Sequence, residues 1–141
     1  MRIAKRVAIL SSLLIVPAFS SALAAGAQNL ETTPQAKVYL ALLKAVAAGD
    51  FEGYKKCMTR ESVKGIDRQT KETGIDPKKA MEFLKAMTPT ELKFTALKVD
   101  GKKATLEATG KVGGEANKGT VALEEEDGQW KVANQSWTNA K

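Results

Sequence analysis

Between residues 33 and 58, apolar side chains recur at helical spacing. In AKVYLALLKAVAAGD they return every three to four residues, which predicts an amphipathic helix. Thr33-Pro34 supplies an N-cap and a first-turn proline, and Gly49 ends the helix. Asp50 can cap a second, shorter helix in DFEGYKKCM, where three residues are spaced to share one face: Phe51, Tyr54 and Met58.

Two further helices are predicted before residue 90. The stretch TRESVKGIDRQTKETG is polar, has Val63 and Ile66 as its apolar anchors, and ends at Gly74. Asp76-Pro77 begins the next helix, and Thr88-Pro89 ends it. The side chains expected to form the buried stripe of this last helix are Ala80, Phe83, Leu84 and Met87.

After Pro89 the apolar period changes from helical to two, which indicates strands. Four antiparallel strands are predicted, in the order ELKFTALKV, KATLEATGKV, TVALEEED and QWKVANQSW, with tight turns at the two Asp-Gly pairs and a loop at GGEANKG. Glu107 and Glu125 are expected to face outward, because pointing inward would require a register slip that exposes the apolar set. The side chains predicted on the inner face are Leu92, Phe94, Leu106, Ala108, Val121, Leu123, Trp130 and Val132.

The stretch LEEEDGQWKV places four carboxylates in a row, at residues 124–127. Consecutive strand residues point to opposite faces, so these acids cannot converge on one ion from a regular strand. The spacing of acids and glycine that an EF-hand requires is also missing. We therefore interpret the stretch as a hairpin whose acidic end stays in water, with Trp130 as its core anchor.

The first 24 residues have the order of parts of a secretory signal peptide. A basic start, MRIAKR, precedes a short apolar run and then SALAAGA, which predicts cleavage between Ala24 and Ala25 in preference to an uncleaved anchor. No Cys follows the cleavage site, so no lipid is expected there. We expect a periplasmic or secreted protein with no stable membrane anchor after cleavage, a flexible lead-in over residues 25–32 and one domain over residues 33–139.

Charge and composition exclude several classes of function. The leader carries Arg2, Lys5 and Arg6, half of the net charge of +6, and the remaining lysines are dispersed among acids, so no nucleic-acid groove is expected. The chain has no His, which excludes Ser–His and Cys–His catalysis, and we expect no metal and no cofactor. Cys57 is the only cysteine, so it forms no internal disulfide; a buried thiol is favoured over an intermolecular bridge.

Two stretches carry a resemblance to a known family. ALLKAVAAGDFEGY and VALEEEDGQWKV make the chain resemble the nuclear transport factor 2-like superfamily, most of all its small exported bacterial members of unknown function. The resemblance implies a cystatin-like α+β fold, with N-terminal helices packed in the concave face of a curved antiparallel sheet of about four strands. Many relatives carry a strand pair between the second and third helices, where residues 59–76 here indicate polar helix or loop.

The resemblance also implies a cone-shaped cavity between helices and sheet. Enzymes of the superfamily place an Asp with a Tyr, or a His–Asp pair, in that cavity; no predicted inward residue here is acidic, so no catalytic residue is assigned. Trp137 has the opposite strand parity from Trp130 unless a bulge intervenes, and it either closes the pocket or lies on the outer face. The candidate ligand-binding residues of the cavity, several of which are equally consistent with plain packing, are Tyr39, Leu43, Tyr54, Met58, Phe83, Met87, Trp130, Asn134 and Ser136.

These observations favour a non-enzymatic exported binding domain. Its expected partner is a small apolar or amphipathic ligand or an envelope protein, and the resemblance adds a homodimer through the sheet face. One alternative is an isomerase or lyase-type enzyme, which would need Tyr39 or Tyr54 within hydrogen-bond reach of Asp50 or Glu107. A protein that inhibits a toxin or confers immunity to it is the other alternative.

Overall fold

A computed structural model describes residues 29–141. The predicted signal peptide and its cleavage site at Ala24 and Ala25 lie outside the described residues. The elements are a 3-10 helix, η1 (Leu30–Thr32), then α1 (Pro34–Ala48), α2 (Phe51–Lys56), α3 (Arg60–Thr73), α4 (Pro77–Ala86), β1 (Thr90–Asp100), β2 (Lys103–Val112), β3 (Glu115–Glu126) and β4 (Gln129–Asn139). The prediction of an α+β fold with four strands after the helices is confirmed.

The helix ends follow the local capping signals. The Thr33 and Asp50 side chains accept hydrogen bonds from backbone N–H groups in the first turns of α1 and α2, and Gly49 ends α1 in the left-handed region at φ +69°. The polar stretch after residue 59 is the regular helix α3, capped by Thr59. Residues 30–32, at the end of the expected flexible lead-in, form the short helix η1.

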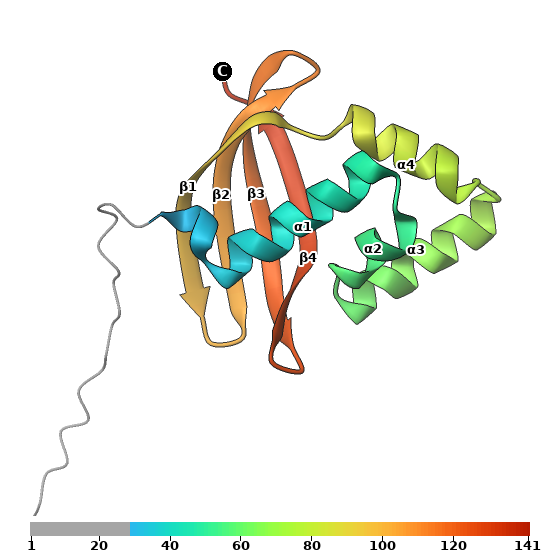
Figure 1. Cartoon of the computed structure of the whole chain (residues 1–141), viewed down its shortest axis with the longest axis horizontal. Helices are drawn as coiled ribbons and strands as arrows, with labels where there is room; N and C mark the ends of the chain where they lie inside the picture. Colours follow the sequence, from blue (N-terminus) through green and yellow to red (C-terminus); the bar gives the residue numbers. More distant parts are fainter. Residues whose placement is uncertain (1–28) are drawn as a thin grey trace, which may run out of the picture.

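The four strands form one curved antiparallel sheet in the order β1-β2-β3-β4 (Figure 1). Helix α1 crosses one face of this sheet, and α2, α3 and α4 gather beside the β4 edge, where α3 and α4 form a helical hairpin. The predicted loop GGEANKG is wrong for its last five residues, which belong to β3. Gly113 and Gly114, at φ +61° and +86°, complete the turn in two residues, so the strand resumes at once.

A bulge interrupts the pairing of β3 with β4. Leu123 pairs with Val132 but Ala122 pairs with Asn134, which leaves Ala133 as the extra residue. The Ser62 hydroxyl of α3 donates a hydrogen bond to the Ala133 carbonyl at 2.7 Å. Beyond the bulge the strand parity is reversed, so the residues past it face opposite sides from those that regular alternation predicts.

This reversal corrects the expectation for the end of β4. Asn134 and Ser136 pair with Ala122 and Thr120, whose side chains lie on the outer face, and both are exposed there rather than inside a cavity. Gln135 pairs with Val121, and Trp137 pairs with Gly119, so these two side chains turn toward the helices. The bulge thus decides that Trp137 lies on the inner side of the sheet.

Glu125 also departs from expectation. It shares strand parity with Leu123 and pairs with Trp130, so it points to the inner side near the turn of the hairpin and is half-buried. The expectation that it faces outward without a register slip was wrong, because residues two apart on a strand share a face. Glu107 is exposed on the outer face, as predicted.

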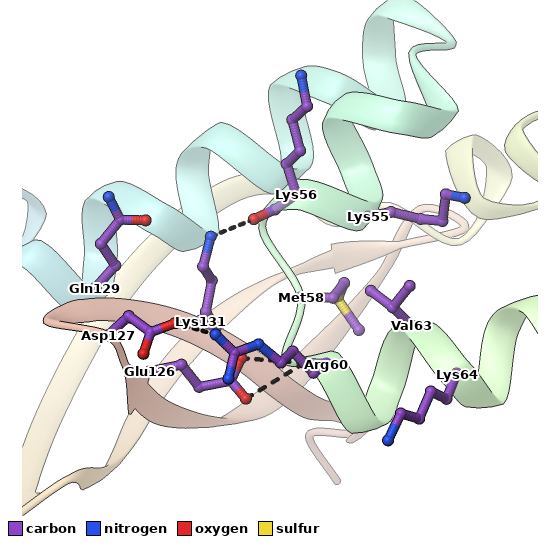
Figure 2. Close-up of a pocket in the computed structure, with 10 residues that line it drawn as sticks. All are labelled: Lys55, Lys56, Met58, Arg60, Val63, Lys64, Glu126, Asp127, Gln129 and Lys131. Carbon is purple, nitrogen blue, oxygen red and sulfur yellow. Dashed lines mark hydrogen bonds and ion pairs between the residues drawn. The ribbon is translucent and has the colours of Figure 1, made fainter.

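The acidic end of the β3–β4 hairpin contacts the start of α3. The Glu126 carboxylate accepts a hydrogen bond from the Arg60 backbone N–H at 3.1 Å, and Asp127 forms an ion pair with the Arg60 guanidinium (Figure 2). Carboxylates are favourable at a helix N-terminus because they meet its unpaired N–H groups. Two of the four acids therefore attach the hairpin to α3, and the described residues contain no cluster of His, Cys, Asp and Glu that could hold a metal ion.

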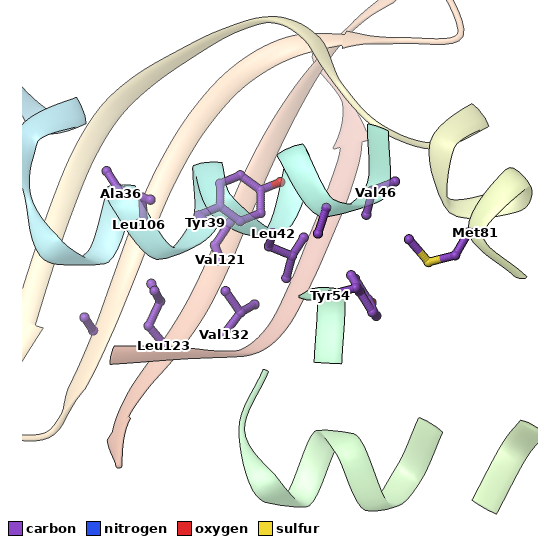
Figure 3. Packing of buried hydrophobic residues seen from close by; sticks show 12 residues of the cluster. Ala36, Tyr39, Leu42, Val46, Tyr54, Met81, Leu106, Val121, Leu123 and Val132 are labelled. Carbon is purple, nitrogen blue, oxygen red and sulfur yellow. The ribbon is translucent and has the colours of Figure 1, made fainter. Parts of the chain in front are cut away.

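The core lies between α1 and the inner face of the sheet (Figure 3). Tyr39 and Leu42 of α1 are fully buried, and α4 contributes Met81. Phe83 and Met87 were predicted to be buried, but 68% and 53% of their surfaces are exposed. Both residues lie on the opposite side of α4 from Met81. The orientation of α4 that buries Met81 therefore leaves Phe83 and Met87 in solvent. The main buried residues of the sheet are Leu106, Val121, Leu123 and Val132.

Candidate functional site

Three polar or amphipathic side chains meet on the inner face. The Tyr39 hydroxyl donates a hydrogen bond to Gln135 Oε1 at 2.8 Å and accepts one from Trp137 Nε1 at 3.3 Å. The Tyr39 ring packs edge-on against Phe94, with ring centroids 6.3 Å apart. Regular strand alternation does not select Gln135, because only the bulge turns its side chain inward.

Burial raises the pKa of Tyr39 to about 12, while the hydrogen bond from Trp137 opposes part of that rise. Burial also raises the pKa of Tyr54. Both hydroxyls therefore stay protonated near neutral pH, and Tyr39 acts as a satisfied structural group with a donor and an acceptor role in the core.

The tyrosine–carboxylate pair required by the enzyme alternative is not found among residues 29–141. Asp50 accepts a hydrogen bond from the Gly53 N–H as a helix cap, and Glu107 lies on the outer face. Within the same part of the chain, neither Tyr39 nor Tyr54 hydrogen-bonds to an acid.

Replacing Tyr39 with phenylalanine tests the hydroxyl. At pH 8 we expect the free energy of unfolding to fall by about 1 kcal/mol, since two hydrogen bonds are lost and both partners can still reach water. The pKa of Tyr39 is raised on folding, so its stabilising contribution is complete below about pH 10 and declines as the pH rises toward 12.

The deficit of the Tyr39→Phe variant should therefore shrink between pH 8 and pH 11, as measured by urea unfolding at each pH. A deficit that grows with pH would contradict the buried, protonated hydroxyl. Tyr54→Phe is the matched control for the hydrogen bonds at pH 8, because the hydrogen bonds found in the described part of the chain involve the hydroxyl of Tyr39 and not that of Tyr54. Burial raises the pKa of Tyr54 as well, so its variant should follow the same trend with pH.

The structure does not bring the nine predicted ligand-binding residues together. Tyr39 and Tyr54 are buried in the core, and Tyr39, Leu42, Leu106 and Val121, which meet between α1 and the sheet, are each 0% exposed. The part of the inner face that α1 covers is thus filled by the chain's own side chains. Of the remaining candidates, three are half-buried and four are exposed: Leu43, Met58 and Trp130, and then Phe83, Met87, Asn134 and Ser136.

A groove of about 460 Å³ lies outside the core, between the end of α2, the start of α3 and the β3–β4 hairpin (Figure 2). We call it the basic groove, because five cationic side chains and only two carboxylates line it. Met58 and Val63 give it an apolar part. The lining residues are Lys55, Lys56, Met58, Arg60, Val63, Lys64, Glu126, Asp127, Gln129 and Lys131.

The cations of the basic groove are not equally engaged. Lys55 pairs with Glu52 at 3.1 Å and with Asp67 at 3.3 Å, and Arg60 pairs with Asp127. Lys131 donates from Nζ to the Lys56 carbonyl at 2.6 Å. The Lys56 and Lys64 side chains form no ion pair within the described residues. These two lysines are available to an anionic group from outside.

Cys57 lies beside this groove and is half-buried rather than fully buried as expected. Burial raises its pKa, which disfavours the thiolate and thus nucleophilic chemistry at neutral pH. Its backbone carbonyl accepts a hydrogen bond from the Val132 N–H at 2.8 Å, and the Thr59 N–H donates to the Val132 carbonyl at 3.0 Å. Residues 57–59 therefore cover the β4 edge next to the bulge.

Comparisons with solved structures find several chains of similar extent. An NTF-2 like protein of unknown function from Shewanella oneidensis MR-1 is 15% identical, with a TM-score of 0.45, and the match covers 75% of this chain and 97% of that one. An NTF2-like protein of unknown function from Cytophaga hutchinsonii ATCC 33406 is 12% identical, with a TM-score of 0.40 and coverages of 79% and 94%.

A de novo designed protein with a curved β-sheet is 16% identical, with a TM-score of 0.44 and coverages of 74% and 96%. No curated protein matches the chain. The sequence profile of the SnoaL-like domain matches residues 36–137, which include all four α-helices except the first two residues of α1, and nearly all of the sheet. The chain therefore belongs to the SnoaL-like domain family, which confirms its resemblance to the nuclear transport factor 2-like superfamily.

Proposed function

We propose that this chain is a non-enzymatic exported domain that binds an acidic segment of an envelope protein in the basic groove. The observation that carries the proposal is the contrast between the filled inner face beneath α1 and an open groove whose Lys56 and Lys64 have no ion pair within the described residues. Because the space beneath α1 is filled, we expect the partner to bind at the surface of the domain. The export step rests on the signal-peptide pattern of residues 1–24.

The side chains of the basic groove favour a partner that carries negative charge and some apolar surface. Lys56, Lys64 and Lys131 offer ammonium groups to carboxylates, while Met58 and Val63 offer contact to an aliphatic or aromatic side chain. One exposed ion pair contributes only about 0.2–1 kcal/mol, so several must act together with the apolar contact. Binding of this kind weakens as salt screens the charges.

The proposal assigns no catalytic residue. Tyr39 keeps its proton at neutral pH and is already hydrogen-bonded to Gln135 and Trp137. A general acid or base must instead contact the substrate, and its own pKa must lie near the working pH.

A labelled peptide of alternating Glu and Leu tests the groove. We expect fluorescence anisotropy to show binding to the purified chain that weakens with added salt. The double variant Lys56→Glu, Lys64→Glu should weaken binding by about tenfold, which corresponds to about 1.4 kcal/mol. The matched control is Lys103→Glu, Lys118→Glu, which reverses two exposed lysines on strands β2 and β3.

Equal losses in the two double variants would show only general charge attraction and would contradict a groove site.

Native mass spectrometry of the chain recovered from a bacterial periplasm tests the alternative of an enclosed ligand. We expect the bare mass of the mature chain, because the inner face beneath α1 is filled. A mass excess that disappears on denaturation would instead favour a small bound molecule.

A further inference from the structure

Helix α4 exposes two large apolar side chains that the core does not use. Phe83 is 68% exposed and Met87 is 53% exposed, and their spacing of four residues puts them side by side on the helix and its C-cap. Ala80 and Leu84, on the same side of the helix, are half-buried. An apolar strip therefore continues from the packed face of α4 into solvent.

Positive charge accompanies this strip. Helix α4 carries Lys78, Lys79 and Lys85 against Glu82 and the N-cap Asp76. Lys79 lies one turn before Phe83 on the exposed side, whereas Lys78 and Lys85 lie on the side of the buried Met81. None of the three lysines forms an ion pair within residues 29–141. An exposed apolar strip on a helix whose lysines lie at its border and on its other sides is typical of helices that lie in the interface of an anionic membrane.

The position of α4 suits such a contact. The α3–α4 hairpin stands beside the sheet, and its turn carries Ile75, which is 45% exposed (Figure 1). At ten residues α4 is too short to hold its shape alone in water, but contacts with α1 and α2 fix it in place.

We propose that α4 docks reversibly on an anionic phospholipid surface. Phe83 and Met87 enter the headgroup region, and Lys79 beside them contacts lipid phosphates, while Lys78 and Lys85 add positive charge within about one Debye length of the surface. A second copy of the chain fits less well, since pairing α4 with α4 would bring Lys79 of both copies together. The inference is independent of the basic groove, which lies on α2, α3 and the β3–β4 hairpin.

Vesicle flotation tests the proposal. The purified chain is mixed with vesicles of phosphatidylglycerol and phosphatidylethanolamine, or of phosphatidylcholine alone, and its mass is measured to establish whether residues 1–24 are present. We expect flotation with the anionic vesicles only. The double variant Phe83→Ser, Met87→Ser, prepared in the same form, should reduce the bound fraction about tenfold, because both apolar contacts are lost.

Val99→Ser is the matched control, because Val99 is an apolar residue with 51% exposure on β1. It should float like the wild type, and the melting temperatures of all variants should agree within a few degrees, since no buried side chain changes. Three results would overturn the proposal: no flotation of the wild type, equal flotation with phosphatidylcholine, or unchanged flotation of the double variant. A wild-type dimer that the double variant converts to monomer, without any flotation, would overturn it in favour of a contact between copies.

Discussion

Replacing Leu42 with alanine is expected to lower the free energy of unfolding by about 2–5 kcal/mol. Leu42 is fully buried between α1 and the sheet, within the same core as Val121 and Leu123 (Figure 3). Truncation there loses the transfer free energy of the removed atoms and leaves a cavity that strands on one side and a helix on the other cannot easily close. Urea unfolding followed by circular dichroism measures the loss.

Leu40 provides the matched control, because it carries the same side chain on the same helix two residues away but is 37% exposed. Leu40→Ala should cost less than about 1 kcal/mol, since less apolar surface returns to water and alanine is the better helix former. Similar losses in the two variants would mean that α1 does not present its Leu42 face to the sheet.

The elements were predictable because their signals are local. A cap, a first-turn proline and a C-terminal glycine act within one turn of backbone, so Thr33, Pro34 and Gly49 mark α1 correctly from sequence alone. The change from helical to twofold apolar period after Pro89 likewise belongs to neighbouring residues. The inner face of the sheet follows from that period wherever the strands are regular.

The end of β4 was not predictable, because its parity depends on a distant contact. Ala133 bulges against Ser62, which lies 71 residues earlier in the chain, and no local pattern marks the position. The choice of Asn134 and Ser136 as cavity residues followed regular alternation and was therefore wrong. A single extra residue exchanged them for Gln135 and Trp137.

The exposed strip and the basic groove escaped prediction for a related reason. Phe83 and Met87 belong to an apolar stripe that is wider than the surface α1 and α2 offer to α4, and sequence does not reveal how much of a stripe is covered. The groove assembles α2, α3 and a hairpin from the far end of the chain. Its Lys55-Lys56 pair looks like ordinary solvated surface until these three segments are brought together.

Replacing Gly119 with alanine should lower the free energy of unfolding by about 1–3 kcal/mol. A Cβ atom at Gly119 would lie 2.5 Å from Trp137 Cζ2 and 2.7 Å from Cη2, well inside van der Waals contact. The indole ring cannot move away freely. Its Nε1 donates a hydrogen bond to the Tyr39 hydroxyl, and Gly110 lies close to the ring at Cη2. The substitution must therefore displace the ring or spread the β3–β4 pairing.

Gly65→Ala makes the same chemical change with the opposite expected sign. Gly65 lies inside α3 with open space around its Cβ position, so alanine should stabilise the chain by about 0.5–1 kcal/mol through helix propensity. Urea unfolding compares the two variants, and near-UV circular dichroism reports the indole environment of Trp137. If Gly119→Ala did not lower the free energy of unfolding, the Trp137 ring would not lie over Gly119. That result would contradict the bulge at Ala133, which turns Trp137 inward. A loss of stability together with a changed indole signal would locate the strain at that ring, and so support the inward turn of Gln135 and Trp137 that closes the core beneath α1.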